Sequence, residues 1–194
     1  MARITIPDEI RIIDQADALS AYLESIGVHH ERWAVEGRVQ PDAAPNEILA
    51  AYTPEIAAVK QRGGYASADV VSVTPETPNV EGMLDRFRKE HTHDEDEVRF
   101  ILKGRGLFFF HPADGPVIRL EVEAGDFIRV PSGVRHWFDL CAERTMRAIC
   151  FCQDDSGGSP HYVADGVHAH YEPVCWSVSD LPTERIAYDW VVQV

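Results

Sequence analysis

Between residues 97 and 152 the sequence is divided into short apolar stretches, each closed by a turn that contains glycine, proline or both. The stretches are EVRFIL, LFFFH, VIRLEV, FIRV, HWFDL and TMRAICFC, and the turns between them include GRG, PADGP, EAGD and PSGVR. Strands of this length and spacing are typical of antiparallel sandwiches and barrels. We therefore predict a mainly β fold with some α.

The N-terminal part of the chain has helical spacing instead. Apolar residues recur every three or four positions, and glycines close two of the segments. Pro54 interrupts one pattern and should divide it into two short helices. The predicted helices span residues 16–26, 46–62 and 80–89, and strands are predicted at 28–35 and, as a buried strand, at 69–73.

Size and charge restrict the class of protein. A chain of 194 residues that is 45% hydrophobic can bury one substantial core, so one domain is expected. Its 18 Lys and Arg against 32 Asp and Glu give a net charge of −14, which argues against nucleic acid or an anionic membrane as a partner. No apolar run approaches the roughly 20 residues of a membrane span, and no signal peptide is evident at the N-terminus. A cytoplasmic location is expected.

Cytoplasmic cysteines are expected to be reduced. The four cysteines show no CxxC spacing, although Cys150 and Cys152 would share one face of a strand. Free cysteines are often buried as small apolar residues, and redox or pocket-lining roles are the alternative. These cysteines are Cys141, Cys150, Cys152 and Cys175.

The stretch EHTHDEDEVRF, residues 90–100, contains a candidate metal site. In an extended backbone His91 and His93 project to the same side and lie roughly 7 Å apart. Glu97 joins them if the DED segment (94–96) forms a solvated bend. Imidazoles with a carboxylate suit a divalent transition metal. A charged, solvated loop is the alternative interpretation of this stretch.

A second stretch, GDFIRVPSGVRHWFDL, could add a ligand from a distant part of the chain. Two tight turns flank the strand FIRV, and His136 begins the returning strand. A hairpin of this kind can deliver one more imidazole across the interior.

The combined spacing is similar to the two-part signature of the cupin superfamily. It reads His91-x-His93-x3-Glu97-x6-Gly104, then Gly125-x5-Pro131-x-Gly133-x2-His136. Leu140 stands where cupins usually have Asn. The stretches EHTHDEDEVRF, GRGLFFFH and VPSGVRHWFDL, with HHERW and AAY upstream, further resemble the acireductone dioxygenase family from about residue 25 to about residue 150.

The resemblance implies a fold and a metal. The fold would be a cupin double-stranded β-barrel of jelly-roll type with the N-terminal helices packed outside. One Fe(II) or Ni(II) per chain would be held, with Co or Mn as possible substitutes. The ligands would be His91, His93, Glu97 and His136. Residues 1–194 would form a single cupin domain with an N-terminal flank (1–80), a metal-binding barrel core (81–153) and divergent C-terminal strands or a tail (154–194).

The resemblance also implies an oxidoreductase of methionine salvage. The substrate would be the acireductone 1,2-dihydroxy-3-keto-5-methylthiopentene, a small enediolate anion that reacts with O2. The iron form would yield 4-methylthio-2-oxobutanoate and formate, and the nickel form 3-methylthiopropanoate, formate and CO. A monomer is expected, with a homodimer as the alternative.

Further residues could act on the substrate. Arg99 has the same parity as Glu97, so its guanidinium should point inward and pair with the substrate oxyanion. A salt bridge from Arg99 to Glu97 is the alternative. Candidate walls for a thioether side chain, each equally plausible as plain core, are Phe87, Ile101, Phe138 and Ala148.

The resemblance weakens after AICFC. Family members often have Arg where this chain has Cys150, and the C-terminal stretch has no recognised counterpart. Two alternatives therefore stay open: a cupin dioxygenase or isomerase that acts on another enediol or diketone, and a non-catalytic cupin that binds a metal or small ligand.

Overall fold

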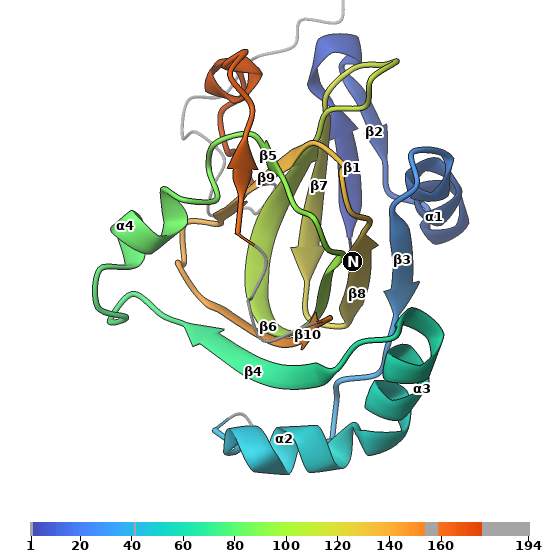
Figure 1. Ribbon diagram of the computed structural model, residues 1–194, viewed down its shortest axis with the longest axis vertical. Helices are drawn as coiled ribbons and strands as arrows, with labels where there is room; N and C mark the ends of the chain where they lie inside the picture. Colours follow the sequence, from blue (N-terminus) through green and yellow to red (C-terminus); the bar gives the residue numbers. More distant parts are fainter. Residues whose placement is uncertain (1, 41, 154–158, 176–194) are drawn as a thin grey trace, which may run out of the picture.

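Two antiparallel sheets that share one long strand form the body of the computed structural model, which describes residues 2–40, 42–153 and 159–175 (Figure 1). One sheet has the order β4 (Ser67–Val73), β10 (Met146–Cys152), β6 (Glu97–Phe110), β8 (Asp126–Val130) and β3 (His29–Arg32). The other has the order β11 (His161–Tyr162), β5 (His91–Thr92), β9 (His136–Leu140), β6, β7 (Ile118–Glu123), β1 (Arg3–Ile6) and β2 (Arg11–Ile13).

Strand β6 passes from one sheet into the other. Its first residues pair with β8 and β10, and residues 105–110 pair with β7 and, from Gly106 on, with β9. The sequence predicted two strands here with a GRG turn between them, and that division is wrong. Gly104 has φ 83°, and a Cβ atom there would lie 1.9 Å from the backbone oxygen of Thr145. Gly104 therefore bends one continuous strand rather than ending it.

The main core lies between the two sheets. Alternate residues of the strands point inward, because successive side chains of a strand face opposite sides. Buried apolar residues from both sheets meet there, and α1 (Ala16–Ser25) adds Leu19 and Leu23. The inward residues from the strands include Ile4, Ile101, Phe108, Phe110, Leu120, Ile128 and Ala148.

A second core covers the outer face of the sheet that contains β4. Helices α2 (Pro45–Ala51) and α3 (Thr53–Gly63) pack there, below the sheet in Figure 1, and Tyr52 between them is fully buried against Phe100. The predicted break is confirmed, since Pro54 lies in the first turn of α3. Mainly β structure, a jelly-roll sheet arrangement and helices on the outside agree with the prediction.

Two further predictions need correction. The predicted helix 80–89 ends early, because α4 covers only Val80–Leu84 and turns follow it. The strand predicted as buried, β4, pairs only with β10 among the described strands. Its residue Val71 is 48% exposed. Short 3-10 turns complete the elements at η1 (Pro7–Glu9) and η2 (Val167–His170).

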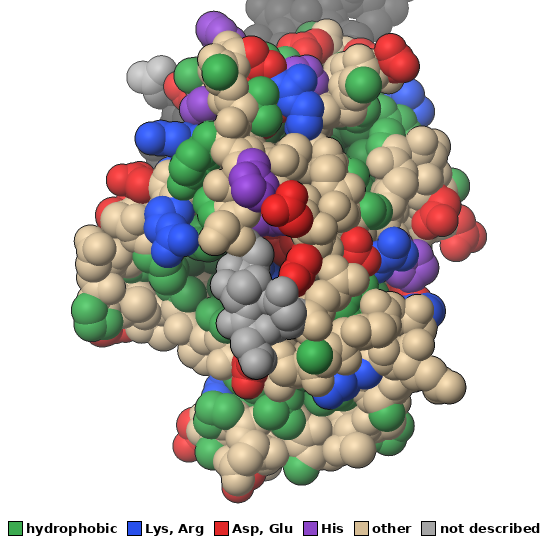
Figure 2. All heavy atoms as spheres, viewed as in Figure 1, with side chains coloured by type: hydrophobic (Ala, Val, Ile, Leu, Met, Phe, Trp, Pro, Cys, Tyr) green, Lys and Arg blue, Asp and Glu red, His purple; other side chains and the backbone are tan. Residues whose placement is uncertain are grey.

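Charged side chains of both signs are interspersed among apolar ones on the face shown in Figure 2. Within the described ranges, no helix has the length and apolar character needed to cross a membrane.

Candidate metal centre

Three histidines from two neighbouring strands meet inside the molecule. Strand β5 carries His91 and ends just before His93, and β9 begins with His136. His91 and His136 are paired in the antiparallel register, which sets their rings 4.6 Å apart. The ring of His93 lies 4.8 Å from that of His91 and 5.3 Å from that of His136. All three side chains are buried.

Each of these imidazoles places its Nδ1 atom beside a backbone carbonyl oxygen. The Nδ1 atom of His91 lies 2.6 Å from the carbonyl oxygen of Lys89, and that of His136 lies 2.8 Å from the carbonyl oxygen of Val134. The Nδ1 atom of His93 lies 3.3 Å from a carbonyl oxygen much further along the chain. A carbonyl can only accept, so Nδ1 carries the proton and Nε2 keeps its lone pair.

The Nε2 atoms face a shared point together with Glu97. Oε2 of Glu97 lies 3.0 Å from Nε2 of His136 and 3.7 Å from Nε2 of His93. Nε2 of His91 is buried and has no hydrogen-bond partner. One ligand atom from each histidine lies within 4.8 Å of those of the other two. A buried, unpaired imidazole nitrogen is costly unless an ion satisfies it, so the group fits a divalent metal.

Electrostatics keeps these groups in the protonation states that a metal needs. Burial, with the neighbouring His136, lowers the pKa of His91 to about 4. Burial also lowers the pKa of His93. Burial alone would raise the pKa of Glu97, but the Arg99 cation and the contact with His136 hold it far below its usual range. At neutral pH the imidazoles of His91 and His93 are therefore neutral and the Glu97 carboxylate is charged, as metal ligands must be.

The bend predicted between His93 and Glu97 is present, but the prediction that all of it is solvated is wrong. Asp94 is largely exposed, and its carboxylate pairs with His161 at 2.8 Å. Asp96, predicted to be solvated, instead accepts hydrogen bonds from Tyr65, Arg129 and the backbone N–H of Ser132. Asp96 thus fixes the end of the bend, and Glu97 starts β6 from a defined position.

A cavity of about 290 Å³ lies beside the cluster. Its charged lining residues are Arg86, Glu97 and Arg99, and Arg99 NH2 lies 3.4 Å from Oε1 of Glu97. The salt bridge that was the alternative for Arg99 is therefore present, and the same side chain also lines the cavity. The remaining lining residues are mainly apolar and include all four predicted wall residues, Phe87, Ile101, Phe138 and Ala148.

The pocket-lining alternative holds for Cys150, which lines the cavity directly across the strand pair from Arg99. Sequence reasoning missed two other contributors to this region. Ser159 supplies the carbonyl beside His93, and Tyr162 sets its ring 6.3 Å from that of His91. No local pattern marks Ser159 or Tyr162, because both reach the site through the fold. The cysteine prediction is wrong for one pair, since Cys141 and Cys175 form a disulfide.

A second cluster of potential ligands lies near the first. Glu90, His111 and Asp165 come together, but the guanidinium of Arg135 already pairs with both carboxylates. His111 Nδ1 lies 2.8 Å from Oε1 of Glu90. The cluster is therefore an ion-pair network that connects the residues preceding His91 and His136.

Comparison with known proteins gives one consistent result. The model of the ARD/ARD′ family matches residues 9–160. An acireductone dioxygenase of Methylococcus capsulatus is 46% identical over 138 residues, which is 71% of this chain and 74% of the relative. One of Granulibacter bethesdensis is 37% identical over 177 residues, which is 88% of this chain and 98% of the relative.

A solved structure has the same fold. It is an acireductone dioxygenase from Bacillus anthracis with a cadmium ion in its active centre. Its TM-score is 0.77 at 37% sequence identity, over 84% of this chain and 98% of that chain.

Proposed function

Because this chain belongs to the ARD/ARD′ family, we propose that it is an acireductone dioxygenase, in which His91, His93, Glu97 and His136 hold one divalent metal. One observation supports this most strongly: ligand atoms of the three histidines lie within 4.8 Å of one another, and Oε2 of Glu97, which lines the cavity, lies 3.0 Å from Nε2 of His136. A substrate in that cavity would lie directly beside the ion.

The metal supplies Lewis acidity and a template that brings an enediolate and O2 together. The protein's own contribution is to hold the ligands in place before the metal arrives. The carbonyl acceptors at Nδ1 orient each imidazole, and burial keeps the rings of His91 and His93 neutral.

Arg99 is proposed to bind the substrate oxyanion. Its guanidinium lies at the polar end of the cavity, within 3.4 Å of Glu97. A cation there attracts a small anion to a protein whose net charge is −14. The same cation keeps Glu97 ionised, so one side chain serves both the ligand and the substrate.

The apolar part of the cavity is proposed to hold the methylthio side chain. Phe87, Ile101, Phe138 and Ala148 line it and exclude water from the reacting group. Cys150 adds a thiol to this wall, and burial raises its pKa, so it stays protonated at neutral pH. Because the family resemblance leads us to expect Arg at that place, a cupin that acts on another enediol or diketone is the second candidate.

The native metal is proposed to be Fe(II) or Ni(II). Imidazole and carboxylate ligands suit both ions, and Co(II) or Mn(II) could substitute. The iron form would give 4-methylthio-2-oxobutanoate and formate, and the nickel form 3-methylthiopropanoate, formate and CO. Either reaction would belong to methionine salvage. A single domain of residues 1–194 that acts as a monomer is part of the proposal.

Metal reconstitution tests the proposal. The metal-free protein is loaded anaerobically with Fe(II) or, separately, Ni(II), and acireductone and O2 are then added. Formate, keto acid and CO are measured, with metal-free protein as the control. We expect the keto acid from the iron form and CO from the nickel form. A metal-loaded protein that forms none of these products would exclude acireductone as the substrate.

A further inference from the structure

The C-terminal segment of residues 159–175, called the strap below, adds a strand to the metal-ligand strands. Its strand β11 pairs with β5, so that Tyr162 lies opposite His91 and His161 opposite Thr92. Just beyond, the backbone N–H of Val163 donates to the carbonyl of Glu90 at 2.9 Å. The strap therefore closes the edge of β5 that would otherwise be open.

The strap also supplies a positioning atom to the metal centre. His91 and His136 each find their carbonyl acceptor two residues earlier in the chain. His93 has no such local acceptor and uses the carbonyl of Ser159, 66 positions away. The orientation of His93 consequently depends on the position of the strap, and loss of such an outer partner typically weakens metal binding 10- to 100-fold.

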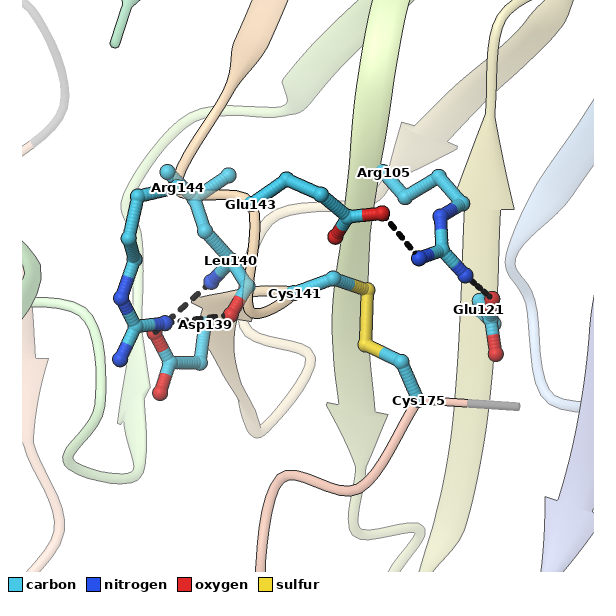
Figure 3. The surroundings of a disulfide bond; sticks show 8 residues. All are labelled: Arg105, Glu121, Asp139, Leu140, Cys141, Glu143, Arg144 and Cys175. Carbon is cyan, nitrogen blue, oxygen red and sulfur yellow. Dashed lines mark hydrogen bonds and ion pairs between the residues drawn. A yellow bond between two sulfur atoms is a disulfide. The ribbon is translucent and has the colours of Figure 1, made fainter. Parts of the chain in front are cut away.

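The far end of the strap is covalently attached. Cys175 forms a disulfide with Cys141, the residue that follows β9, with 5.8 Å between the Cα atoms (Figure 3). Both cysteines are buried in an apolar cluster with Trp137, which is next to His136. The strap thus begins on one ligand strand and is fastened at the end of the other.

Between these two points the contacts of the strap are non-covalent, and Val167 and Tyr171 pack against the apolar cluster of Trp137. Asp165 pairs with Arg135, the ring of Tyr171 lies 6.1 Å from that of Trp137, and the Tyr171 hydroxyl donates to Asp8 at 2.7 Å. The ion pair is partly exposed, and exposed pairs contribute little to stability. The disulfide closes a loop of 34 residues, which greatly restricts the open states of the strap.

We propose that the Cys141–Cys175 disulfide controls metal retention. With the bond closed, the strap holds the Ser159 carbonyl against His93. With the bond cleaved, the strap opens more often, His93 loses its acceptor, and the metal leaves faster. This inference rests on the metal centre of the proposed function. The buried sulfur atoms make the bond a slow, durable fastening rather than a rapidly exchanging one.

Cleavage can be carried out with a water-soluble phosphine. The phosphorus atom attacks one sulfur and the S–S bond breaks. Water then supplies the oxygen of the phosphine oxide and the two protons of the thiols. Two electrons pass from phosphorus to the disulfide, so the step is balanced. Mass spectrometry after alkylation reports the fraction cleaved, because each freed thiol takes one alkyl group.

Nickel release measures the consequence. The full chain is loaded with Ni(II), and transfer of the ion to excess chelator is followed before and after cleavage. We expect release to be about 10- to 100-fold faster after cleavage. Hydrogen exchange of the Val163 amide should also quicken, since that amide reports the β11–β5 pairing.

The double variant Cys141→Ala/Cys175→Ala is the matched control. It should release Ni(II) as fast as the cleaved wild type and should not respond to the phosphine, which separates cleavage from any effect of the reagent on the metal. Thermal unfolding confirms that the variant is folded. Equal release and equal Val163 protection before and after cleavage would overturn this inference alone. Failure of the untreated chain to bind Ni(II) would overturn the proposed function as well.

Discussion

Nε2 of His136 lies 3.0 Å from Oε2 of Glu97, although 39 positions separate the two residues in the sequence. The contact joins the start of β9 to the start of β6. The two atoms lie close enough together to bind the same metal ion as ligands. We therefore expect the Glu97 carboxylate and the His136 imidazole to bind one metal ion together with His91 and His93.

We predict that Glu97→Gln weakens Ni(II) binding at least about 100-fold, because it removes the only carboxylate of the proposed ligand set. Competition with a chelator measures the dissociation constant. Asp94→Asn is the matched control, since it removes a carboxylate from the same bend whose side chain is 87% exposed. A Glu97→Gln variant that binds Ni(II) as tightly as the wild type would remove Glu97 from the ligand set.

Arg99→Ala is expected to lower turnover about 100-fold while the bound metal stays at one per chain. The reason is that the guanidinium acts on the substrate anion, and loss of one such charged donor typically costs 10²–10³ in rate. Arg99→Lys should recover part of the rate, because the charge returns without the planar fork. Steady-state kinetics and elemental analysis are measured on the same samples. Loss of metal in Arg99→Ala would instead show that Arg99 supports Glu97 structurally.

Gly104→Ala should destabilise the protein by at least about 3 kcal/mol. A Cβ atom at this position would lie 1.9 Å from the backbone oxygen of Thr145, and the backbone has φ 83°. Gly37→Ala separates the two effects, since Gly37 has φ 73° with nothing within 4 Å of the added atom. Only the left-handed strain of about 1–2 kcal/mol should appear there. Urea unfolding of both variants checks the difference.

Ionisation of Glu31 should make the free energy of unfolding depend on pH in the acid range. Burial alone would raise its pKa, but hydrogen bonds from Trp33, His29 and Arg62 outweigh burial and lower the pKa to about 2. A lowered pKa in the folded state stabilises the fold above the ordinary value of 4.5, and that contribution is lost as the pH falls towards 2.

Glu31→Gln should therefore be less stable than the wild type at pH 7, with the difference shrinking as the pH falls below 4.5. Urea midpoints at pH 7, 4.5 and 3 measure it. Glu36→Gln changes an exposed carboxylate and should show no comparable trend. A constant difference across this pH range would contradict the assignment.

Local patterns were enough for most elements of the fold. Short apolar stretches between glycine- and proline-containing turns located β7, β8, β9 and β10, and helical spacing with Pro54 located α1 and the break between α2 and α3. These signals succeed because a strand or a helix is set by residues that are near one another in the chain. The division at Gly104 failed, because a glycine can either end a strand or bend it, and only the neighbouring strand decides which.

The amino-acid sequence by itself determined the types of the proposed ligands, their spacing in residues 91–97, and the alternation that turns Arg99 to the same side as Glu97. The tertiary structure decided what those residues meet: Ser159 beside His93, Cys150 across from Arg99, Asp96 held by Arg129, and Cys141 joined to Cys175. Each of these contacts joins segments far apart in the chain. Periodicity and spacing describe neighbours within one segment, whereas the meeting of two segments depends on the path of all the chain between them.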